Sequence, residues 1–143
     1  MIALRRHLFI FLLLTLAFMA GAQAREITLF DSEGEAVAYI DTSDEATIYL
    51  WSGKPVAYLH GKSIYGFNGK HLGWFDQGVI LDHKGNGVGF IRGAANKPTR
   101  LEGLKSLQSF KPLKSLKELE PLKPRNSNQW ARLPLERFLL SGL

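Results

Sequence analysis

The chain contains no cysteine among its 143 residues. This absence excludes a disulfide scaffold, a thiolate metal site and a cysteine nucleophile. Beyond residue 24 the sequence also lacks any apolar stretch near the roughly 20 residues that a membrane-spanning helix needs. Glycine and proline, with 14 and 6 residues, are too few for a wholly disordered chain. With 45% hydrophobic residues, the composition predicts one globular domain.

Recognisable catalytic motifs are missing as well. The sequence has no G-x-S-x-G elbow, no P-loop and no calcium-binding loop. Three histidines follow residue 24, namely His60, His71 and His83, and none of their spacings is that of a metal-ligand pair. They also fall in different columns of the repeat described below, so we do not expect them to meet. The sequence therefore predicts no metal and no cofactor.

Residues 1–24 have the three parts of a secretory signal peptide. A positive region at Arg5 and Arg6 precedes an apolar run of 14 residues that ends at Gly21, and Ala22-Gln23-Ala24 offers a small-x-small cleavage site. The alternative is a membrane anchor, but the run is shorter than the roughly 20 residues that cross a bilayer. We therefore expect cleavage after Ala24 and an exported chain with no membrane span in its mature form. The periplasm is the expected destination, and the extracellular space is the alternative.

Positive charge is concentrated in the last third of the chain. Residues 25–93 carry six Lys/Arg and nine Asp/Glu, a net charge of −3, whereas residues 94–143 carry ten and four, a net charge of +6. An exported protein with a mildly acidic compact part is not expected to bind nucleic acid. The basic segment predicts contact with an anionic polymer of the cell envelope or with an envelope protein.

Residues 27–91 contain a four-fold repeat. It aligns on Gly34, Gly53, Gly69 and Gly85, at spacings of 19, 16 and 16 residues. Each copy has an aliphatic and a bulky residue before the glycine, and after it Val or Leu, then Ala or Gly, then an aromatic residue. Each copy predicts a β-hairpin that turns at the glycine, and Asn68-Gly69 is the strongest signal for a type I′ turn.

Pairing outward from this turn gives each hairpin two apolar faces. Ser63 is expected opposite Trp74 and Tyr65 opposite Leu72, so that Tyr65, Leu72 and Trp74 share a face. A lone hairpin is not stable in water, so we expect an all-β fold of four hairpins around a pseudo-fourfold axis. The small residue of each copy is expected nearest the axis, where the backbones converge. These small residues are Ala38, Ala57, Gly73 and Gly89.

The segment Ile27–Gly93 resembles the bacterial 4-fold β-flower domain, most closely over Thr47–Leu59, Ile64–Phe75 and Asp82–Asn86. The resemblance covers about half of the chain. It implies a small all-β domain with fourfold internal pseudosymmetry, a bacterial source and no established activity, so no catalytic residues carry over. The first repeat departs from the regular spacing through an extra stretch, Asp41–Glu45, which we expect to lengthen a surface loop.

Residues 94–124 form a tail with a period of three. Leucine or phenylalanine occupies every third position from Leu101 to Leu122. Polyproline II has three residues per turn and places these side chains on one edge, whereas an α-helix would wind them around its axis, and Pro112 and Pro121 would interrupt it. The period predicts a polyproline II-like tail. A disordered linker and a short helix over Leu101–Phe110 are the alternatives.

Residues 125–143 are expected to end in a short helix, since Pro134 suits its start and Gly142 its end. The apolar residues of this segment predict that it docks on the β domain, and partner binding is the alternative. Two aromatic residues beside hairpin tips, Trp51 and Phe67, are candidates for sugar or peptide contact unless the C-terminal segment covers them.

These observations together predict a non-catalytic binding or structural module of the cell envelope. Its candidate binding residues are Trp51 and Phe67 in the hairpins and Lys111, Lys114 and Lys117 on a second edge of the tail. The alternative is a small envelope hydrolase with paired carboxylates, such as Asp31 and Asp82, which share a repeat column.

Overall fold

The structure is a computed structural model that describes residues 25–143. The expected signal peptide and its cleavage site therefore lie outside the described residues. Eight strands are followed by one short helix. They are β1 (Glu26–Phe30), β2 (Ala36–Asp41), β3 (Thr47–Leu50), β4 (Pro55–His60), β5 (Ser63–Gly66), β6 (His71–Asp76), β7 (Val79–Leu81), β8 (Gly87–Phe90) and α2 (Leu135–Leu140).

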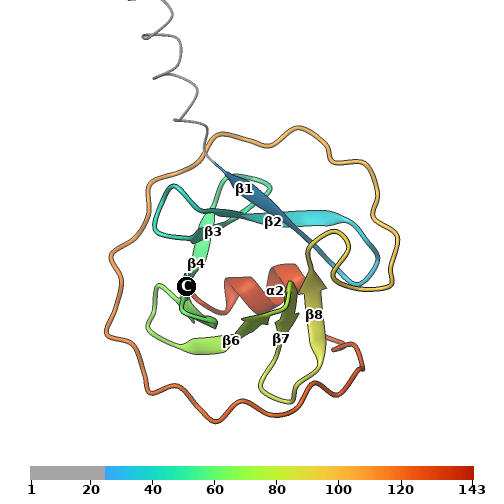
Figure 1. Cartoon of the computed structure of the whole chain (residues 1–143). Helices are drawn as coiled ribbons and strands as arrows, with labels where there is room; N and C mark the ends of the chain where they lie inside the picture. The colour runs from blue at the N-terminus through green and yellow to red at the C-terminus, as the bar shows by residue number, and fades with distance from the viewer. Residues whose placement is uncertain (1–24) are drawn as a thin grey trace, which may run out of the picture.

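The strands close into one antiparallel barrel. Each strand pairs with the next along the chain, and β8 pairs with β1 (Figure 1). The hairpins β1–β2, β3–β4, β5–β6 and β7–β8 are the four repeats, so the predicted all-β fold of four hairpins is confirmed. The closing pair is the shortest, because β1 and β8 meet only at Phe30 and Phe90.

The hairpin turns are longer by one residue than the predicted type I′ form. Gly69 has φ +85°, but Asn68 is not among the residues with positive φ. The N–H of Gly69 donates to the carbonyl of Gly66 at 3.0 Å, and the N–H of Gly66 donates to the carbonyl of Lys70 at 2.9 Å. This is a turn closed by a glycine bulge, and the same two hydrogen bonds recur in the other three hairpins.

The bulge changes which side chains share a face. Ser63 pairs with Trp74 as predicted, but Tyr65 pairs with His71 and not with Leu72. Because side chains alternate across a strand, the extra residue turns Leu72 into the barrel, where it joins the core. The expectation that Leu72 shares a face with Tyr65 and Trp74 was therefore wrong.

The connection between the first two hairpins is extended, as the irregular repeat spacing predicted. Residues 42–46 link β2 to β3, whereas residues 61–62 and 77–78 make the equivalent links further along. Glu45 and Ala46 both have φ 54° in this loop. Two successive residues in the left-handed region turn the chain back sharply into β3.

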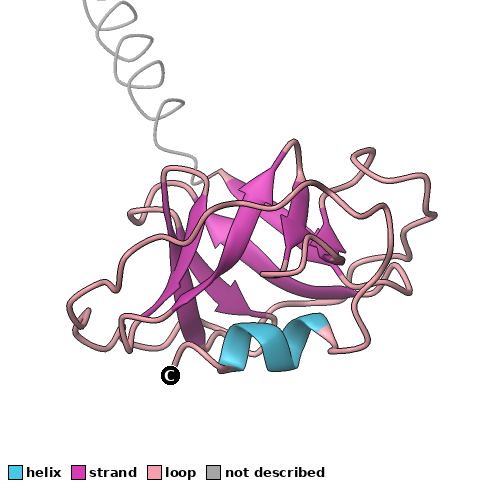
Figure 2. Cartoon of the chain, turned by 90° about the horizontal axis from the view of Figure 1, so that it is seen from below, coloured by secondary structure: helices cyan, strands magenta, loops and turns pink. Residues whose placement is uncertain are grey.

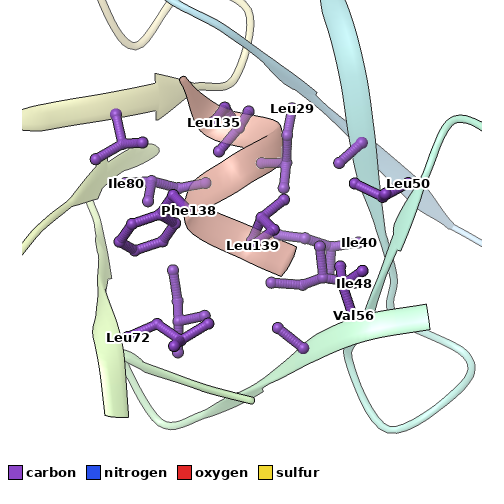
Figure 3. Close-up of a cluster of buried hydrophobic side chains, with 14 residues drawn as sticks. Leu29, Ile40, Ile48, Leu50, Val56, Leu72, Ile80, Leu135, Phe138 and Leu139 are labelled. Carbon is purple, nitrogen blue, oxygen red and sulfur yellow. The ribbon is translucent and has the colours of Figure 1, made fainter. Parts of the chain in front are cut away.

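Helix α2 fills the barrel interior from one end. It lies across one mouth of the barrel in Figure 2 and at the centre of the ring of strands in Figure 1. Leu135, Phe138 and Leu139 are buried, because positions i, i+3 and i+4 lie on one face of a helix. Figure 3 shows these side chains meeting inner residues of the strands, among them Ile48 and Ile80. The predicted docking of the C-terminal segment on the β domain is confirmed.

The small residues of the repeat face this helix. A Cβ atom on Gly73 would overlap the carbonyl oxygen of Leu81 and lie 2.9 Å from Cζ of Phe138. A Cβ atom on Gly89 would lie 2.8 Å from Cδ2 of Leu135. At both glycines the backbone approaches a neighbouring strand closely, since the Cβ atoms would also overlap the carbonyl oxygen of Leu81 and lie 3.0 Å from that of Phe30. The close approach lies between strands and not on the axis, because an eight-stranded barrel encloses a space that side chains must fill.

Candidate functional site

The tail runs around the outside of the barrel as a belt, which we define as residues 98–127 (Figure 1, orange). Its backbone N–H groups donate to the carbonyl of the tip glycine of each hairpin in turn, always at 2.9 Å. The donors are spaced by nine residues, which is three turns of polyproline II. The donor and acceptor pairs are Arg100 and Gly34, Ser109 and Gly53, Glu118 and Gly69, and Ser127 and Gly85.

These hydrogen bonds show that the tail is ordered and extended. Leu101–Phe110 contains no helix, and the segment is extended and hydrogen-bonded to the barrel. A second set of bonds joins the N–H of Ser106 to the carbonyl of Trp51 and that of Ser115 to the carbonyl of Phe67, at 3.1 and 2.8 Å. The extended tail is thus matched to the barrel by one nine-residue unit per hairpin.

Two belt prolines, Pro112 and Pro121, occupy positions that need no donor. Gly103, Pro112 and Pro121 are spaced by nine residues, and none donates a backbone hydrogen bond to a barrel carbonyl among residues 25–143. Pro124 occupies the position equivalent to Ser106 and Ser115, which leaves that contact without a donor. Proline fixes the extended φ and removes an N–H, so it suits these positions.

The tip glycines are required both by the turn and by the belt. Their φ values lie between +78° and +86°, in the left-handed region. A Cβ atom on any of them would also overlap a belt carbonyl oxygen. The overlapping pairs are Gly34 and Pro98, Gly53 and Leu107, Gly69 and Leu116, and Gly85 and Arg125.

The polar edge of the belt faces the barrel. Its lysines form ion pairs with barrel carboxylates, which accounts for the opposite net charges of the two segments. Lys111 Nζ lies 2.6 Å from Asp44 Oδ1, and Lys123 Nζ lies 2.9 Å from Asp76 Oδ2. The remaining pairs of the belt lysines are Lys105 with Glu26, Lys111 with Glu45 and Lys114 with Glu45.

The outer face of the barrel beneath the belt is aromatic. Nζ of Lys105 lies 4.5 Å from the ring centroid of Tyr39, and Nζ of Lys114 lies 4.2 Å from that of Tyr58. Each ammonium group lies over the face of an aromatic ring, which is the geometry of a cation–π contact. Tyr65 donates its hydroxyl hydrogen bond to the carbonyl of Glu118 at 3.0 Å. The belt therefore covers aromatic rings with polar side chains.

The apolar edge of the belt points away from the protein. Its side chains form what we call the rim, and each is 93–102% exposed. Soluble proteins rarely leave large apolar side chains together in solvent, and such patches mark interaction sites. The rim consists of Leu101, Leu104, Leu107, Phe110, Leu113, Leu116, Leu119 and Leu122.

The two aromatic candidates lie under the belt. Phe67 is only 3% exposed, and its ring packs against Tyr58 at a centroid distance of 5.6 Å. Trp51 is half-buried, with Nζ of Lys105 at 5.3 Å from its ring. The carbonyls of both residues accept belt hydrogen bonds, so the belt, and not the segment 125–143, covers them.

The three lysine candidates divide into two kinds. Lys111 and Lys114 are engaged with Asp44 and Glu45 in the long β2–β3 loop. The pKa of Asp44 is lowered by the hydrogen bonds from Lys111 and Tyr49. Lys117 is exposed and has no ion-pair partner in the described part of the chain. The structure thus leaves Lys117 as the most accessible of the three.

The shared column of Asp31 and Asp82 has a structural basis. Oδ1 of Asp31 accepts the backbone N–H groups of Glu33 and Glu35, each at 2.9 Å. Oδ1 of Asp82 accepts those of Lys84 and Asn86, also at 2.9 Å. Both carboxylates hold their own hairpin turns, which is a common task for aspartate.

A chain of polar side chains lies where the third and fourth hairpins meet, with Ser63 and His71 buried and His83 exposed. Nδ1 of His71 lies 2.9 Å from Nε2 of His83, and Nε2 of His71 lies 3.0 Å from Oγ of Ser63. Glu120 of the belt accepts a hydrogen bond from Nε1 of Trp74 at 3.0 Å. Burial, followed by the proximity of His83, lowers the pKa of His71. We call Ser63, His71 and His83 the relay.

The expectation that the histidines do not meet was wrong for this pair. A column of the repeat contains the equivalent residues of the four hairpins. Residues that contact each other between neighbouring strands can belong to different columns. Trp74 pairs with Leu81 between β6 and β7, and extending that register places His71 diagonal to His83. Both residues flank a turn glycine at a distance of two positions, which was the signal available in the sequence.

The described residues contain no group of three or more His, Asp or Glu side chains arranged to hold a metal ion. Within the same residues, no helix has the length and hydropathy needed to cross a bilayer.

One comparison with known proteins gives a match. A family model described as 4-fold beta flower protein matches residues 27–139, which include the belt and most of α2 as well as the barrel. No curated protein and no solved structure matches the chain. The match extends well beyond Gly93, where the resemblance noted in the sequence ended.

Proposed function

Because the chain belongs to the 4-fold beta flower family, which is not a known family of enzymes, we propose that it is a non-catalytic binding module whose binding surface is the rim. The proposal places the module in the cell envelope, with residues 1–24 as its export signal. The partner is an envelope protein with an apolar groove that accepts part of the belt.

The exposure of the rim carries this proposal. Burial of one leucine or phenylalanine side chain stabilises by about 1.5–3 kcal/mol. One nine-residue unit presents three such side chains, for example Phe110, Leu113 and Leu116, and these are almost fully exposed. Their burial contributes roughly 5–9 kcal/mol before the cost of association, which is sufficient for a specific contact.

The geometry favours an apolar partner over an anionic polymer. Lys111 and Lys114 face the barrel and are already paired with carboxylates, so the belt presents leucine outward in place of charge. A hydrolase based on Asp31 and Asp82 has no support either, because both carboxylates hold hairpin turns.

The test compares the full chain with a rim variant that carries Leu104→Ser, Leu113→Ser and Leu122→Ser. A matched variant carries Lys54→Ser and Lys70→Ser, which are exposed barrel residues. We expect the rim variant to keep its thermal unfolding transition and to lose capture of one defined envelope protein, confirmed with the purified partner. The matched variant should retain capture.

Equal recovery by the rim variant contradicts the proposal. Rim-dependent binding to lipid vesicles, with no protein captured, contradicts the choice of a protein partner and assigns the rim to a membrane surface.

A further inference from the structure

A hollow of about 560 Å³ opens at the mouth of the barrel beside α2. It lies between the β7–β8 turn and the segment that leads into the helix. Its lining combines apolar side chains with a group of polar and basic ones, and this is the usual character of a small-molecule site. Among the lining residues are His83, Lys84, Asn86, Trp130, Arg132 and Phe138.

The walls of this hollow are held in place by the fold. Gly87 of β8 donates to the carbonyl of Gln129 and accepts from the N–H of Ala131, both at 2.8 Å. The ring of Trp130 packs edge-on against Phe90 at a centroid distance of 5.8 Å. A Cβ atom on Gly87 would lie 3.2 Å from this indole, so glycine lets the ring lie close to the strand. A preformed wall reduces the entropy that a ligand must overcome on binding.

The charge around the hollow is positive. Lys84 and Arg132 form no salt bridge within residues 25–143, unlike most lysines of the belt. The lining includes the carboxylate of Asp82, but its Oδ1 already accepts two backbone N–H groups. A guanidinium and an ammonium without partners beside an apolar wall favour an anionic group on a ligand.

The relay fixes one further polar group in the lining. Nε2 of His71 lies 3.0 Å from Oγ of Ser63, and Nδ1 of His71 lies 2.9 Å from Nε2 of His83. The order that suits an anionic ligand has the Ser63 hydroxyl donating to Nε2 of His71 and Nδ1–H of His71 donating to Nε2 of His83. This order leaves the N–H at Nδ1 of His83 available as a donor to a ligand. His71 itself is only 2% exposed, so the support behind His83 is buried.

We propose that this hollow binds a small aromatic anion. Arg132 and Lys84 hold its phosphate or carboxylate group, and His83 provides a further hydrogen bond. Trp130 and Phe138 contact its ring. This site is separate from the rim and does not depend on the function proposed for it.

The test is a titration of the full chain with phenyl phosphate, benzoate and phenol. The indole N–H signal of Trp130 and the backbone amide signal of His83 are followed by NMR. We expect saturable shifts of both signals with at least one anion and no saturation with phenol over the same range. The preference between the two anions identifies the acidic group.

Two variants make the test specific. Arg132→Gln should weaken anion binding at least tenfold, whereas Arg137→Gln, on α2 but outside the lining, should leave it unchanged. Both variants should show the thermal midpoint of the parent chain. The proposal is overturned if neither anion shifts the two signals, if phenol binds as well as the anions, or if both variants weaken binding equally.

Discussion

At the scale of single residues, the tip glycines show how one position serves two neighbours. Gly69 takes a left-handed φ to close its hairpin, and its missing side chain admits the carbonyl of Leu116. Gly93 has nearly the same φ, +84°, but no atom lies within 4 Å of its Cβ position. Substitution of alanine at the two positions therefore distinguishes two contributions to the loss of stability. One is the strain of a Cβ atom at positive φ, and the other is the displacement of the belt.

Gly69→Ala should destabilise the protein by about 3 kcal/mol or more, and Gly93→Ala by about 1–2 kcal/mol. The smaller figure is the ordinary cost of a Cβ atom in the left-handed region, and the excess at Gly69 reports the belt contact. Urea unfolding at equilibrium measures both. Equal costs at the two glycines would show that the belt does not press on the hairpin tips.

The ion pair between Lys111 and Asp44 should make part of the stability depend on pH. The pKa of Asp44 lies below its ordinary value because Lys111 and Tyr49 donate hydrogen bonds to it. The folded chain therefore binds fewer protons than the unfolded chain near pH 3–4. This contribution is fully present above about pH 4 and is lost as the pH falls through the folded pKa.

Lys111→Ala should cost about 0.5–1 kcal/mol at pH 7, the range of partly exposed ion pairs, and nearly nothing at pH 2. Lys117→Ala, at an exposed belt position, should change the stability at neither pH. Urea midpoints of the two variants and the parent at both pH values decide the matter. A pH-independent loss in Lys111→Ala would mean that the lysine acts by packing rather than by its charge.

At the scale of elements, the belt departs from the usual rule for amphipathic segments. The period of three in its sequence predicts the extended conformation, but burial of apolar residues would predict that leucines face the barrel. They face away because the barrel surface is lined with carboxylates and aromatic rings, which suit lysine. The nine-residue spacing of the belt donors matches the distance from one hairpin tip to the next, and this distance is known only from the structure.

Gly103→Pro should therefore be neutral or stabilise the protein by up to about 1 kcal/mol. Position 103 corresponds to Pro112 and Pro121, donates to no barrel carbonyl within the described chain, and has its nearest neighbour, Trp51 Nε1, 4.0 Å from a Cβ atom. Ser109→Pro should instead cost about 1–3 kcal/mol, because it leaves the buried carbonyl of Gly53 without its donor. Thermal unfolding of the two variants gives the comparison, and a stabilised Ser109→Pro would refute the nine-residue match.

The sequence was sufficient for the four hairpins and the terminal helix, because each depends on a local period or turn signal. For the tail, the period of three predicted an extended form but left a disordered linker and a short helix open. It was insufficient for features that depend on one hairpin meeting another. The bulge that turns Leu72 inward is one such feature, and the contact of His71 with His83 is another. Trp51 and Phe67 were singled out as surface aromatics, but only the path of the belt determines that they are covered.

At the scale of the whole molecule, the barrel is incomplete without the segment that follows the belt. Leu135, Phe138 and Leu139 pack with residues from all eight strands in one core. Removing them leaves an apolar cavity that eight short strands cannot collapse to fill. The belt depends on the same closure, since its acceptors are four separate hairpins.

A chain that ends at Arg132 should accordingly show no cooperative thermal transition. Phe138→Ala should retain a transition but lose about 3–5 kcal/mol, the usual cost of a large cavity in a core. Circular dichroism during heating distinguishes the two. A truncated chain that unfolds cooperatively would show that the barrel holds itself together, and a partner experiment could then use it in place of the full chain.

The position of α2 in the chain also fixes when folding can occur. Leu29 of β1 packs in the same buried cluster as Leu139 of α2. The ribosome adds Leu139 more than 100 residues after Leu29. We expect a growing chain to lack a complete core until Leu139 has been added. Cooperative folding of the barrel should therefore begin only when synthesis is nearly finished.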